Sequence, residues 1–165
     1  MEQTESILSG ARADGRSVLF EHEVYRILGT AGIDTPRWVF WPAVQGVLHT
    51  SALPPVVQAF LSDIPGERLV LKIVSPQILH KSDVGGLAFC TADPSEILAA
   101  AGKIWDETGR RSPGADRRGL LLMERVPAVL GTIAAETLLS VKQDPAFGTV
   151  LVLGLGGLLT EWFGK

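Results

Sequence analysis

The sequence predicts an α/β fold, and three observations lead to this class. Segments with helical periodicity alternate along the chain with short apolar runs that are typical of strands. Apolar residues make up 46% of the 165 residues and charged residues 20%, which is ordinary for a globular protein. Glycine and proline separate most of the segments. A chain of this length can bury a core as one domain or as a compact pair of lobes.

The N-terminal half is expected to begin with a polar lead-in, residues 1–16, followed by a helix. Ser17 can cap this helix, Gly29 and Gly32 end it, and Pro36 prevents it from resuming. Strands and helices then alternate. They are a strand at 38–41, a helix at 54–61 with proline at its start, strands at 68–74 and 87–91, and a helix that opens at 93–96 and runs to about residue 107.

The C-terminal third contains mainly strands after a polar loop at 110–118. The expected strands are 119–126, which Pro127 stops, then 134–141 and 149–153. Asp144-Pro145-Ala146-Phe147-Gly148 is a strong turn signal between the last two strands. The segment 158–163 still resembles core sequence, so we expect a truncated domain rather than a natural end.

The most informative segment is the apolar run 69–74, because Lys72 lies inside it. A turn follows, then a polar loop with His80 and Lys81, then a Gly-Gly pair. Burying an unpaired ammonium costs about several kcal/mol, so Lys72 should have an anionic partner. The glycine-bearing loop is a plausible place for a phosphate. The alternative is a lysine that reaches solvent from an edge strand, with a solvated turn after it.

Charge and motif spacing argue against several function classes. Net charge is −3 and no basic run exceeds two residues, which does not favour nucleic-acid binding. The sequence contains one cysteine, Cys90, and no His-x-x-x-His or Glu-x-x-His pattern, so we expect no metal site. Cys90 is expected to be a small buried hydrophobe. Gly154-Leu155-Gly156-Gly157 lacks the spacing of a Rossmann or P-loop motif, and a tight turn is the alternative.

Neither a signal peptide nor a membrane span is expected. The first six residues are polar. Residues 38–62 carry no charge, but three prolines and several polar residues interrupt them, whereas a spanning helix needs about 20 mostly apolar residues. These features and the single cysteine favour a cytoplasmic protein.

Two histidines and two glutamates need a local interpretation. His22 is expected at the surface because glutamates flank it, and His49 has no partner in the sequence. Glu124 ends an apolar strand, where a carboxylate either faces a ligand cleft or marks the solvent edge. Glu136 lies in the next strand and could lie across from Glu124.

Residues 70–86 closely resemble the nucleotide-binding signature of the ATP-grasp domain of ADP-forming acyl-CoA synthetases. Acetyl-CoA synthetase (ADP-forming) is the nearest type, and the succinyl-CoA synthetase β subunit is a more distant relative. Three further segments resemble the family in order: the opening helix and turn at 21–36, the hinge strand at 123–127, and the paired strands at 141–157. The resemblance extends from about Ser17 to the end, and implies a partial ATP-grasp domain over 17–165, chiefly its N-terminal nucleotide-binding lobe.

The resemblance implies that ATP or ADP is the ligand and assigns roles to seven binding residues. Lys72 would contact the α- and β-phosphates. The loop that carries Lys81, Gly85 and Gly86 would cover the phosphates. The remaining three are Glu124 and the backbone near Val126, which would hold the adenine, and Glu136, which would contact the ribose.

The resemblance also implies that His80 is catalytic. It would accept a phosphoryl group from a phosphohistidine on the CoA-ligase part and pass it to ADP, or run the reverse. Imidazole is a suitable nucleophile, and lysines with magnesium would supply the positive charge that phosphoryl transfer needs. The implied partners are CoA-binding and CoA-ligase domains or an α subunit. The family reaction interconverts acyl-CoA, ADP and phosphate with acid, CoA and ATP.

Departures from the family pattern limit these expectations. Ser140 stands where the family usually has glycine, and 128–135 lacks the usual Gly-Gly. The carboxylates that bind magnesium in the family would lie beyond the end of this chain, so the chain alone should not complete the reaction. Two alternatives remain: a non-catalytic nucleotide-sensing module attached to a lysine acetyltransferase, and a folded piece that binds nothing. The sequence specifies neither the acyl group nor the oligomeric state.

Overall fold

The computed structural model describes residues 2–64, 66–126 and 137–155, and the chain divides into two units, Met1–Arg125 and Val126–Lys165. The first unit contains, in order, α1 (Glu2–Ala13), α2 (Glu21–Thr30), β1 (Trp38–Pro42), α3 (Pro55–Ser62), β2 (Arg68–Val74), the 3₁₀ turn η1 (Ser82–Val84), β3 (Leu87–Thr91), α4 (Pro94–Arg111) and β4 (Gly119–Glu124). The second contains β5 (Thr137–Asp144) and β6 (Gly148–Leu155). No helix in the described ranges is long and apolar enough to cross a membrane.

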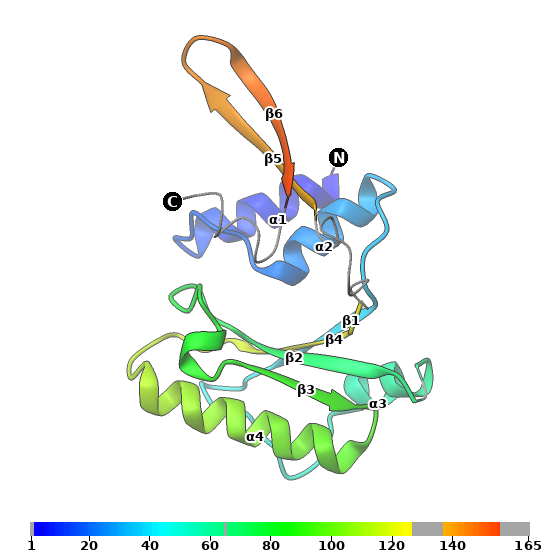
Figure 1. Cartoon of the computed structure of the whole chain (residues 1–165). Helices are drawn as coiled ribbons and strands as arrows, with labels where there is room; N and C mark the ends of the chain where they lie inside the picture. Colours follow the sequence, from blue (N-terminus) through cyan, green and yellow to red (C-terminus); the bar gives the residue numbers. More distant parts are fainter. Residues whose placement is uncertain (1, 65, 127–136, 156–165) are drawn as a thin grey trace. The chain divides into compact units, whose positions relative to one another are not determined.

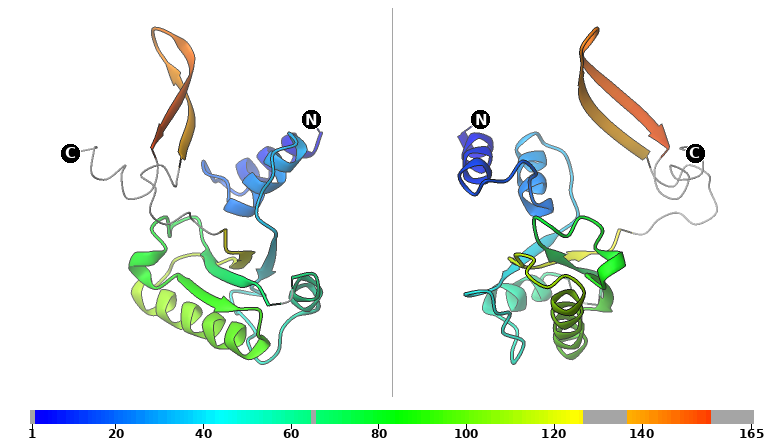
Figure 2. Two further views of the ribbon diagram at one scale, coloured as in Figure 1. Left: turned by 45° about the vertical axis from the view of Figure 1, so that its right-hand side comes forward. Right: turned by 90° about the vertical axis from the view of Figure 1, so that its left-hand side faces the viewer.

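The first unit is built on a four-stranded sheet with the order β1–β4–β2–β3, in which all neighbouring strands are antiparallel. Helices α3 and α4 cover one face of this sheet, and α1 and α2 lie on the other side (Figures 1 and 2). In the register, Lys72 lies opposite Leu87 of β3 and Leu121 of β4. The mixed α/β class is therefore confirmed. The edge-strand alternative for Lys72 is wrong, because β2 is an interior strand.

The two faces of the sheet bury different side chains, as the alternation along a strand requires. The face toward α3 and α4 carries the main core, which includes Leu69, Leu71, Ile73, Leu120 and Leu122. The opposite face carries a smaller cluster, which consists of Val70, Val74, Leu121 and Met123 with Phe20, Tyr25, Trp38, Phe40 and Leu87 packed against it. Lys72 lies between Leu71 and Ile73 in the sequence, so its side chain is on the opposite face of the sheet from theirs. This is the face that carries Val70 and Val74.

Several element boundaries differ from those expected. The polar N-terminal stretch forms the helix α1, in which Glu2 and Glu5 lie in the first turn, where the helix dipole favours negative charge, and Ala11 is buried. The helix expected from Ser17 begins at Glu21, because the chain bends at residues 17–18, where Arg16 donates to Val18 O (3.1 Å), and Phe20 is extended (φ −71°, ψ 153°). The third difference concerns the ends of two elements: α4 continues to residue 111, and β4 stops at residue 124.

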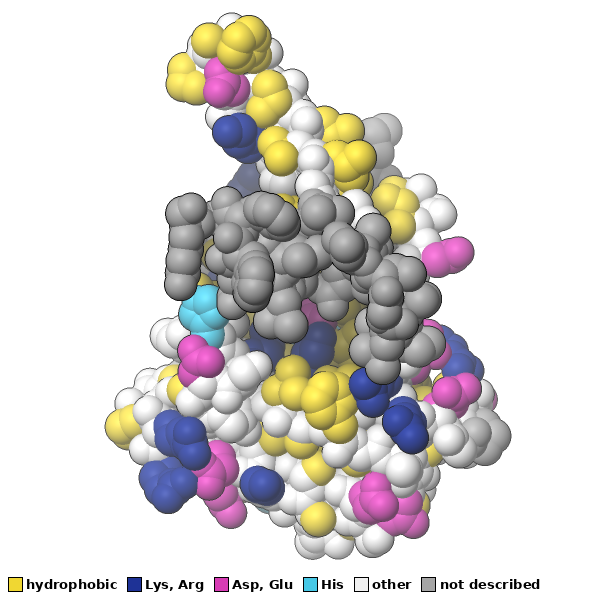
Figure 3. Space-filling model, in the orientation of Figure 1, with side chains coloured by type: hydrophobic (Ala, Val, Ile, Leu, Met, Phe, Trp, Pro, Cys, Tyr) yellow, Lys and Arg dark blue, Asp and Glu magenta, His cyan; other side chains and the backbone are white. Residues whose placement is uncertain are grey.

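The described part of the second unit, residues 137–155, forms a β-hairpin, as the turn signal predicts. Asp144 pairs with Gly148, and Asp144 Oδ1 accepts hydrogen bonds from the backbone N–H groups of Ala146 (2.9 Å) and Phe147 (3.1 Å). Hydrophobic side chains are exposed along this hairpin, at the top of Figure 3. Gly154 continues β6, while Gly156 and Gly157 lie outside the described residues, as do the first three positions of the strand expected at 134–141.

Cys90 lies on β3, where its half-buried side chain packs against the main core. Burial, together with the nearby Glu96 carboxylate, raises the pKa of the Cys90 thiol to about 11. A thiol that stays protonated at neutral pH is a poor nucleophile. Cys90 therefore behaves as the small hydrophobe that the sequence predicts, although it is only partly buried.

Candidate functional site

A cavity of about 200 Å³ opens on the α2 side of the sheet, between the start of α2, strand β2 and the turn that follows it. Its walls are largely apolar, and its charged residues are Glu21, Lys72 and Lys81. Lys72 comes from the middle of β2, Lys81 from the loop before η1, and Glu21 is the first residue of α2. The two lysines expected to bind phosphates thus line one cavity, although they are nine positions apart in the sequence.

The anionic partner that the sequence predicts for Lys72 is Glu21. Lys72 Nζ donates to Glu21 Oε1 at 2.6 Å, and Tyr25 OH donates to the same oxygen at 2.7 Å. The side chains of Lys72 and Glu21 are only 19% and 26% exposed, so the pair is partly desolvated. Burial alone would raise the pKa of Glu21, but the hydrogen bonds from Lys72 and Tyr25 lower it below its ordinary value. Glu21 is therefore an ionised carboxylate within the cavity.

The loop between β2 and β3 places His80 and Lys81 differently. Lys81 lines the cavity, whereas His80 is exposed beside it and is not among the residues of the cavity wall. An exposed imidazole next to a cationic cavity is accessible to a group on another domain or subunit. Its role as a phosphoryl carrier remains a prediction.

Gly85 and Gly86 close the same loop, and the structure gives both an architectural reason. Gly85 has φ 69°, a left-handed conformation that ends η1. A Cβ on Gly86 would lie 2.5 Å from Ile73 Cγ2 and 3.0 Å from Lys81 O, because Gly86 packs between β2 and α4. Gly86 also donates its N–H to Lys81 O at 2.7 Å. The pair therefore fixes the path of the loop that carries Lys81.

Glu124 and Lys72 lie on opposite faces of the sheet. Glu124 is opposite Leu69 in the register, and Leu69 belongs to the α3 and α4 face. Arg37 Nε donates to Glu124 Oε2 at 2.6 Å, and this hydrogen bond lowers the pKa of Glu124. Val126 is exposed just after β4, and Glu136 lies outside the described residues. Glu124 therefore does not lie with the lysines, and the contacts of Glu124, Val126 and Glu136 with a nucleotide remain predictions.

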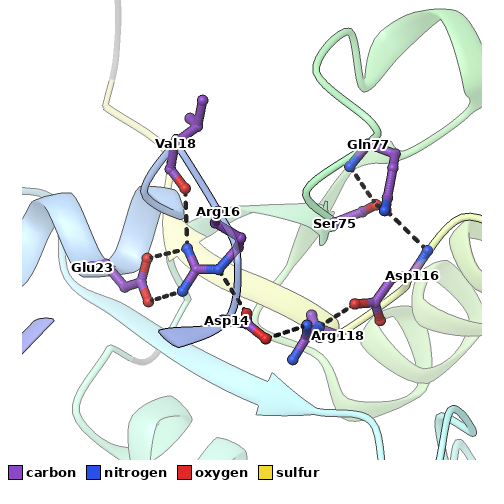
Figure 4. Close-up of polar contacts among 8 residues, drawn as sticks. All are labelled: Asp14, Arg16, Val18, Glu23, Ser75, Gln77, Asp116 and Arg118. Atoms are coloured by element: carbon purple, nitrogen blue, oxygen red, sulfur yellow. Dashed lines mark hydrogen bonds and ion pairs between the residues drawn. The ribbon is translucent and has the colours of Figure 1, made fainter. Parts of the chain in front are cut away.

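A chain of alternating charges fixes the segment that leads into α2 (Figure 4). Arg16 forms two hydrogen bonds with Glu23 (2.8 and 2.9 Å) and one with Asp14 (2.7 Å). Asp14 also accepts from Arg118 at 2.8 Å. Glu23 Oε2 accepts from Phe20 N at 2.7 Å, which satisfies a backbone donor at the helix start. This network holds the N-terminus of α2, and with it Glu21, in a defined position.

The same chain of charges reaches the turn after β2. Arg118 Nε donates to Asp116 Oδ2 at 2.6 Å, and Asp116 N donates to Gln77 Oε1 at 3.0 Å. Gln77 N donates in turn to Ser75 Oγ at 3.2 Å. The turn that carries the chain from Lys72 toward His80 is therefore tied to the segment that leads into β4 (Figure 4).

The expectation that His22 lies at the surface is wrong. His22 is 7% exposed, and its ring stacks on Phe40 at 4.5 Å and on Phe20 at 5.7 Å between ring centroids. Its Nδ1 has no hydrogen-bond partner among the described residues. Burial lowers the pKa of His22; Arg26 and Arg16 lower it further, and the neighbouring glutamates 21 and 23 oppose this. His22 is therefore a neutral core residue that anchors α2 to β1.

His22 makes the stability of the protein depend on pH. Its pKa is lowered in the folded state, so the unfolded chain binds the proton more tightly, and stability should fall as pH drops through the ordinary histidine value of 6.5. We expect His22→Phe to raise the free energy of unfolding at pH 7 by about 1 kcal/mol, because the unsatisfied nitrogen is removed. The difference between mutant and wild type should grow from pH 7 to pH 5. Urea unfolding at both pH values measures this.

The exposed His49 supplies the matched control, since His49→Gln should leave the pH profile of stability unchanged. An identical pH dependence in wild type and His22→Phe would contradict the assignment of a buried, neutral His22.

Magnesium is implied by the family, but the described part of the chain offers no site for it. Within the described ranges, no group of three or more histidine, cysteine, aspartate or glutamate side chains could hold a metal ion. Magnesium ligands beyond the end of the chain remain a prediction.

Comparison with known proteins identifies the family of this chain. A family model described as an ATP-grasp domain matches residues 10–165. The chain belongs to the ATP-grasp family. The match begins inside the stretch expected to be a polar lead-in and covers the sheet, the cavity and the hairpin sequence. The expected ATP-grasp fold is therefore confirmed.

The relatives of this ATP-grasp chain include ADP-forming CoA ligases. It is 30% identical over 155 residues to the β subunit of acetate–CoA ligase [ADP-forming] I of Pyrococcus furiosus, and the match covers 94% of the chain and 60% of the relative. The chain thus spans about three fifths of that relative, and homology to β subunits of this kind is established.

Solved structures lead to the same group. Acetyl-coenzyme A synthetase 1 of Ca. Korarchaeum cryptofilum, in complex with coenzyme A, Ca-AMPCP and HgCl+, matches with a TM-score of 0.74 at 28% identity, covering 98% of this chain and 64% of that one. A second structure of this synthetase contains coenzyme A and Mg-AMPPCP, with a phosphohistidine segment pointing towards the nucleotide binding site. It matches with a TM-score of 0.69 at 29% identity and covers 98% of this chain and 61% of that one.

The sequence did not identify two residues of the site. Glu21 and Tyr25 precede Lys72 by 51 and 47 residues and belong to a different element. The signal that could have found them is their spacing, because residues four apart on a helix lie on the same face. The spacing alone does not select Glu21 as the partner of Lys72, because that contact depends on how α2 packs against the sheet.

Proposed function

We propose that this chain is the ATP-grasp part of an ADP-forming acyl-CoA synthetase and binds ATP or ADP at the cavity that Lys72 and Lys81 line. The observation that carries the proposal is the convergence of these two lysines, from a buried strand and from the adjoining loop, on one cavity. Ammonium groups at fixed positions are suited to the phosphates of a nucleotide. The ADP-forming ligases among its relatives give the reaction class.

In this proposal each expected residue has a separate task. Lys72 contacts the α- and β-phosphates, while Lys81 and the loop closed by Gly85 and Gly86 cover them. The adenine lies at the end of β4, where the backbone near Val126 contributes more than the Glu124 side chain, because Arg37 already binds that carboxylate. Glu136 contacts the ribose.

His80 relays the phosphoryl group in this scheme. Its imidazole nitrogen attacks phosphorus as the P–N bond of the partner's phosphohistidine breaks, and a β-phosphate oxygen of ADP then attacks as the new P–N bond breaks. The reverse sequence begins from ATP. The partner is a CoA-binding and CoA-ligase part, either in the same polypeptide or as an α subunit, and magnesium enters as the complex with the nucleotide. No observation favours the lysine acetyltransferase alternative.

Titration with ATP tests the proposal. The wild-type chain should bind ATP, and Lys72→Ala should weaken binding by at least about 100-fold, because a desolvated charge pair to phosphate is removed. Isothermal titration calorimetry with and without magnesium measures this. Lys103→Ala, an exposed lysine of α4, is the matched control and should bind as wild type does. Equal affinities of wild type and Lys72→Ala would refute the assigned phosphate site.

A further inference from the structure

The cavity that we assign to phosphates contains a carboxylate of its own. Lys72 and Lys81 bring two positive charges to its wall and Glu21 brings one negative charge, so these three residues have a net charge of only +1. Lys72 donates one of its three N–H groups to Glu21, which leaves two for a ligand. An anion that reaches Lys72 therefore also approaches Glu21.

Glu21 cannot easily turn away from that ligand. Its Oε1 accepts from Tyr25, one helical turn later, as well as from Lys72. Glu23 and Arg16 fix the start of the helix by the hydrogen bonds described above, and Arg16 lies over the Phe20 ring at 3.9 Å. The Glu21 carboxylate thus stays where the backbone places it, at the cavity wall.

A fixed carboxylate repels an anionic ligand more strongly when that ligand carries more negative charge. Repulsion between like charges in a partly desolvated site grows with each negative charge that the ligand carries. A free triphosphate carries four or so negative charges at neutral pH, and a divalent cation chelated by its own oxygens cancels about two of them. Glu21 therefore repels the free triphosphate much more strongly than the triphosphate that carries a chelated cation. This difference in repulsion makes the site selective for the chelated ligand.

We propose that Glu21 is a specificity-determining residue of the Lys72 site, which makes the site prefer a polyphosphate that already carries a chelated divalent cation over the free polyanion. The inference rests on the proposed nucleotide function and deepens it. It requires no metal ligand from the protein, because the ligand's own oxygens hold the cation. Glu21 also holds Lys72 in place, so its removal should change selectivity more than it changes the affinity for the chelated ligand.

Binding of inorganic tripolyphosphate tests the inference, because this probe contacts the phosphate site without contributions from adenine. The dissociation constant is measured by calorimetry at low ionic strength, once with excess magnesium and once with EDTA. The wild type should bind the magnesium complex at least about tenfold more tightly than the free ligand. In Glu21→Gln this ratio should fall by about tenfold, mainly because the free ligand binds more tightly.

Two further variants separate the charge of Glu21 from other effects. Glu67→Gln makes the same change of charge at an exposed residue that does not line the cavity, and it should keep the wild-type ratio. Tyr25→Phe removes a hydrogen bond to Glu21 but keeps its charge, and it should also keep the ratio. Circular dichroism verifies folding, and Glu21→Ser replaces Glu21→Gln if that variant does not fold.

The outcomes distinguish this inference from the proposed function. Tripolyphosphate binding that depends on Lys72, with the same ratio in wild type and in the folded Glu21 variant, would overturn the role of Glu21 alone. A wild type that prefers the free ligand would do the same. Absence of binding, or binding that Lys72→Ala does not weaken, would overturn the phosphate site and the inference together.

Discussion

His80→Ala is expected to reduce acid-, CoA- and ATP-dependent acyl-CoA formation by at least about 10³-fold in the complete enzyme, since the nucleophile that carries the phosphoryl group is lost. The exposed His80 does not line the cavity of Lys72 and Lys81, so the same change should leave ATP binding within about twofold of wild type. Steady-state kinetics of the assembled enzyme and calorimetry of this chain measure the two effects.

His49 provides the matched control for this experiment. It is another exposed histidine and lies away from the cavity, so His49→Ala should retain full activity. In addition, wild type incubated with γ-labelled ATP and magnesium should acquire an acid-labile phosphoryl group that His80→Ala lacks. Normal turnover by His80→Ala would eliminate the relay while leaving the nucleotide site untouched.

Gly119→Ala should be the most destabilising change of a single methyl group among the described glycines. Gly119 begins β4 with φ 147°, which side chains rarely adopt, and an added Cβ would collide with Trp41 O and lie 2.9 Å from Pro42 Cα. Both neighbours are backbone of β1, so neither can turn aside as a side chain would. We expect a loss of about 3 kcal/mol and a fall in Tm of roughly 10 °C, measured by thermal and urea unfolding.

Gly102→Ala is the opposite test at another glycine. Gly102 lies within α4, and a Cβ there would meet no atom within 4 Å. Alanine should therefore stabilise the protein by about 0.5–1 kcal/mol through better helix propensity. Equal free energies of unfolding for Gly119→Ala and Gly102→Ala would contradict the close contact of β1 with β4 at Gly119.

Local sequence patterns predicted the parts of the fold that depend on local chemistry. The strand around Lys72 is an uninterrupted apolar run with one charge, and its expected bounds, 68–74, agree with β2. The turn at 144–148 was also predictable, because aspartate, proline and glycine each favour a particular backbone conformation there. The family resemblance then supplied the ATP-grasp fold, which the family model confirms.

The features that the sequence analysis predicted wrongly or missed depend on contacts between segments that are distant in the sequence. The neighbours of His22 in sequence are glutamates, but its burial is decided by Phe40 and Trp38, which belong to a strand that follows the helix. The choice of Glu21 over other anions for Lys72 likewise needs the docking of α2 on the sheet. Neither the burial of His22 nor the pairing of Glu21 with Lys72 can be predicted from a local sequence pattern.

The site residues show the same division. Lys72 was found by its chemistry and Lys81 was assigned by the family resemblance, and the two share a cavity. Glu124, which the resemblance assigned to the adenine, lies on the other face of the sheet. The glycines at 85 and 86 were assigned to a ligand, but the conformation of the first and the tight packing of the second explain them without one. Residues of a binding motif can therefore serve the packing of the fold as well as ligand binding.

The raised pKa of Cys90 offers a practical route to following the loop in solution. This thiol is the single cysteine in the sequence, and it should react slowly with maleimides at neutral pH. A cysteine introduced at the exposed Leu79 would then accept a fluorophore selectively. The probe would sit next to the loop histidine and report movements there, with no need to remove the native thiol from the core.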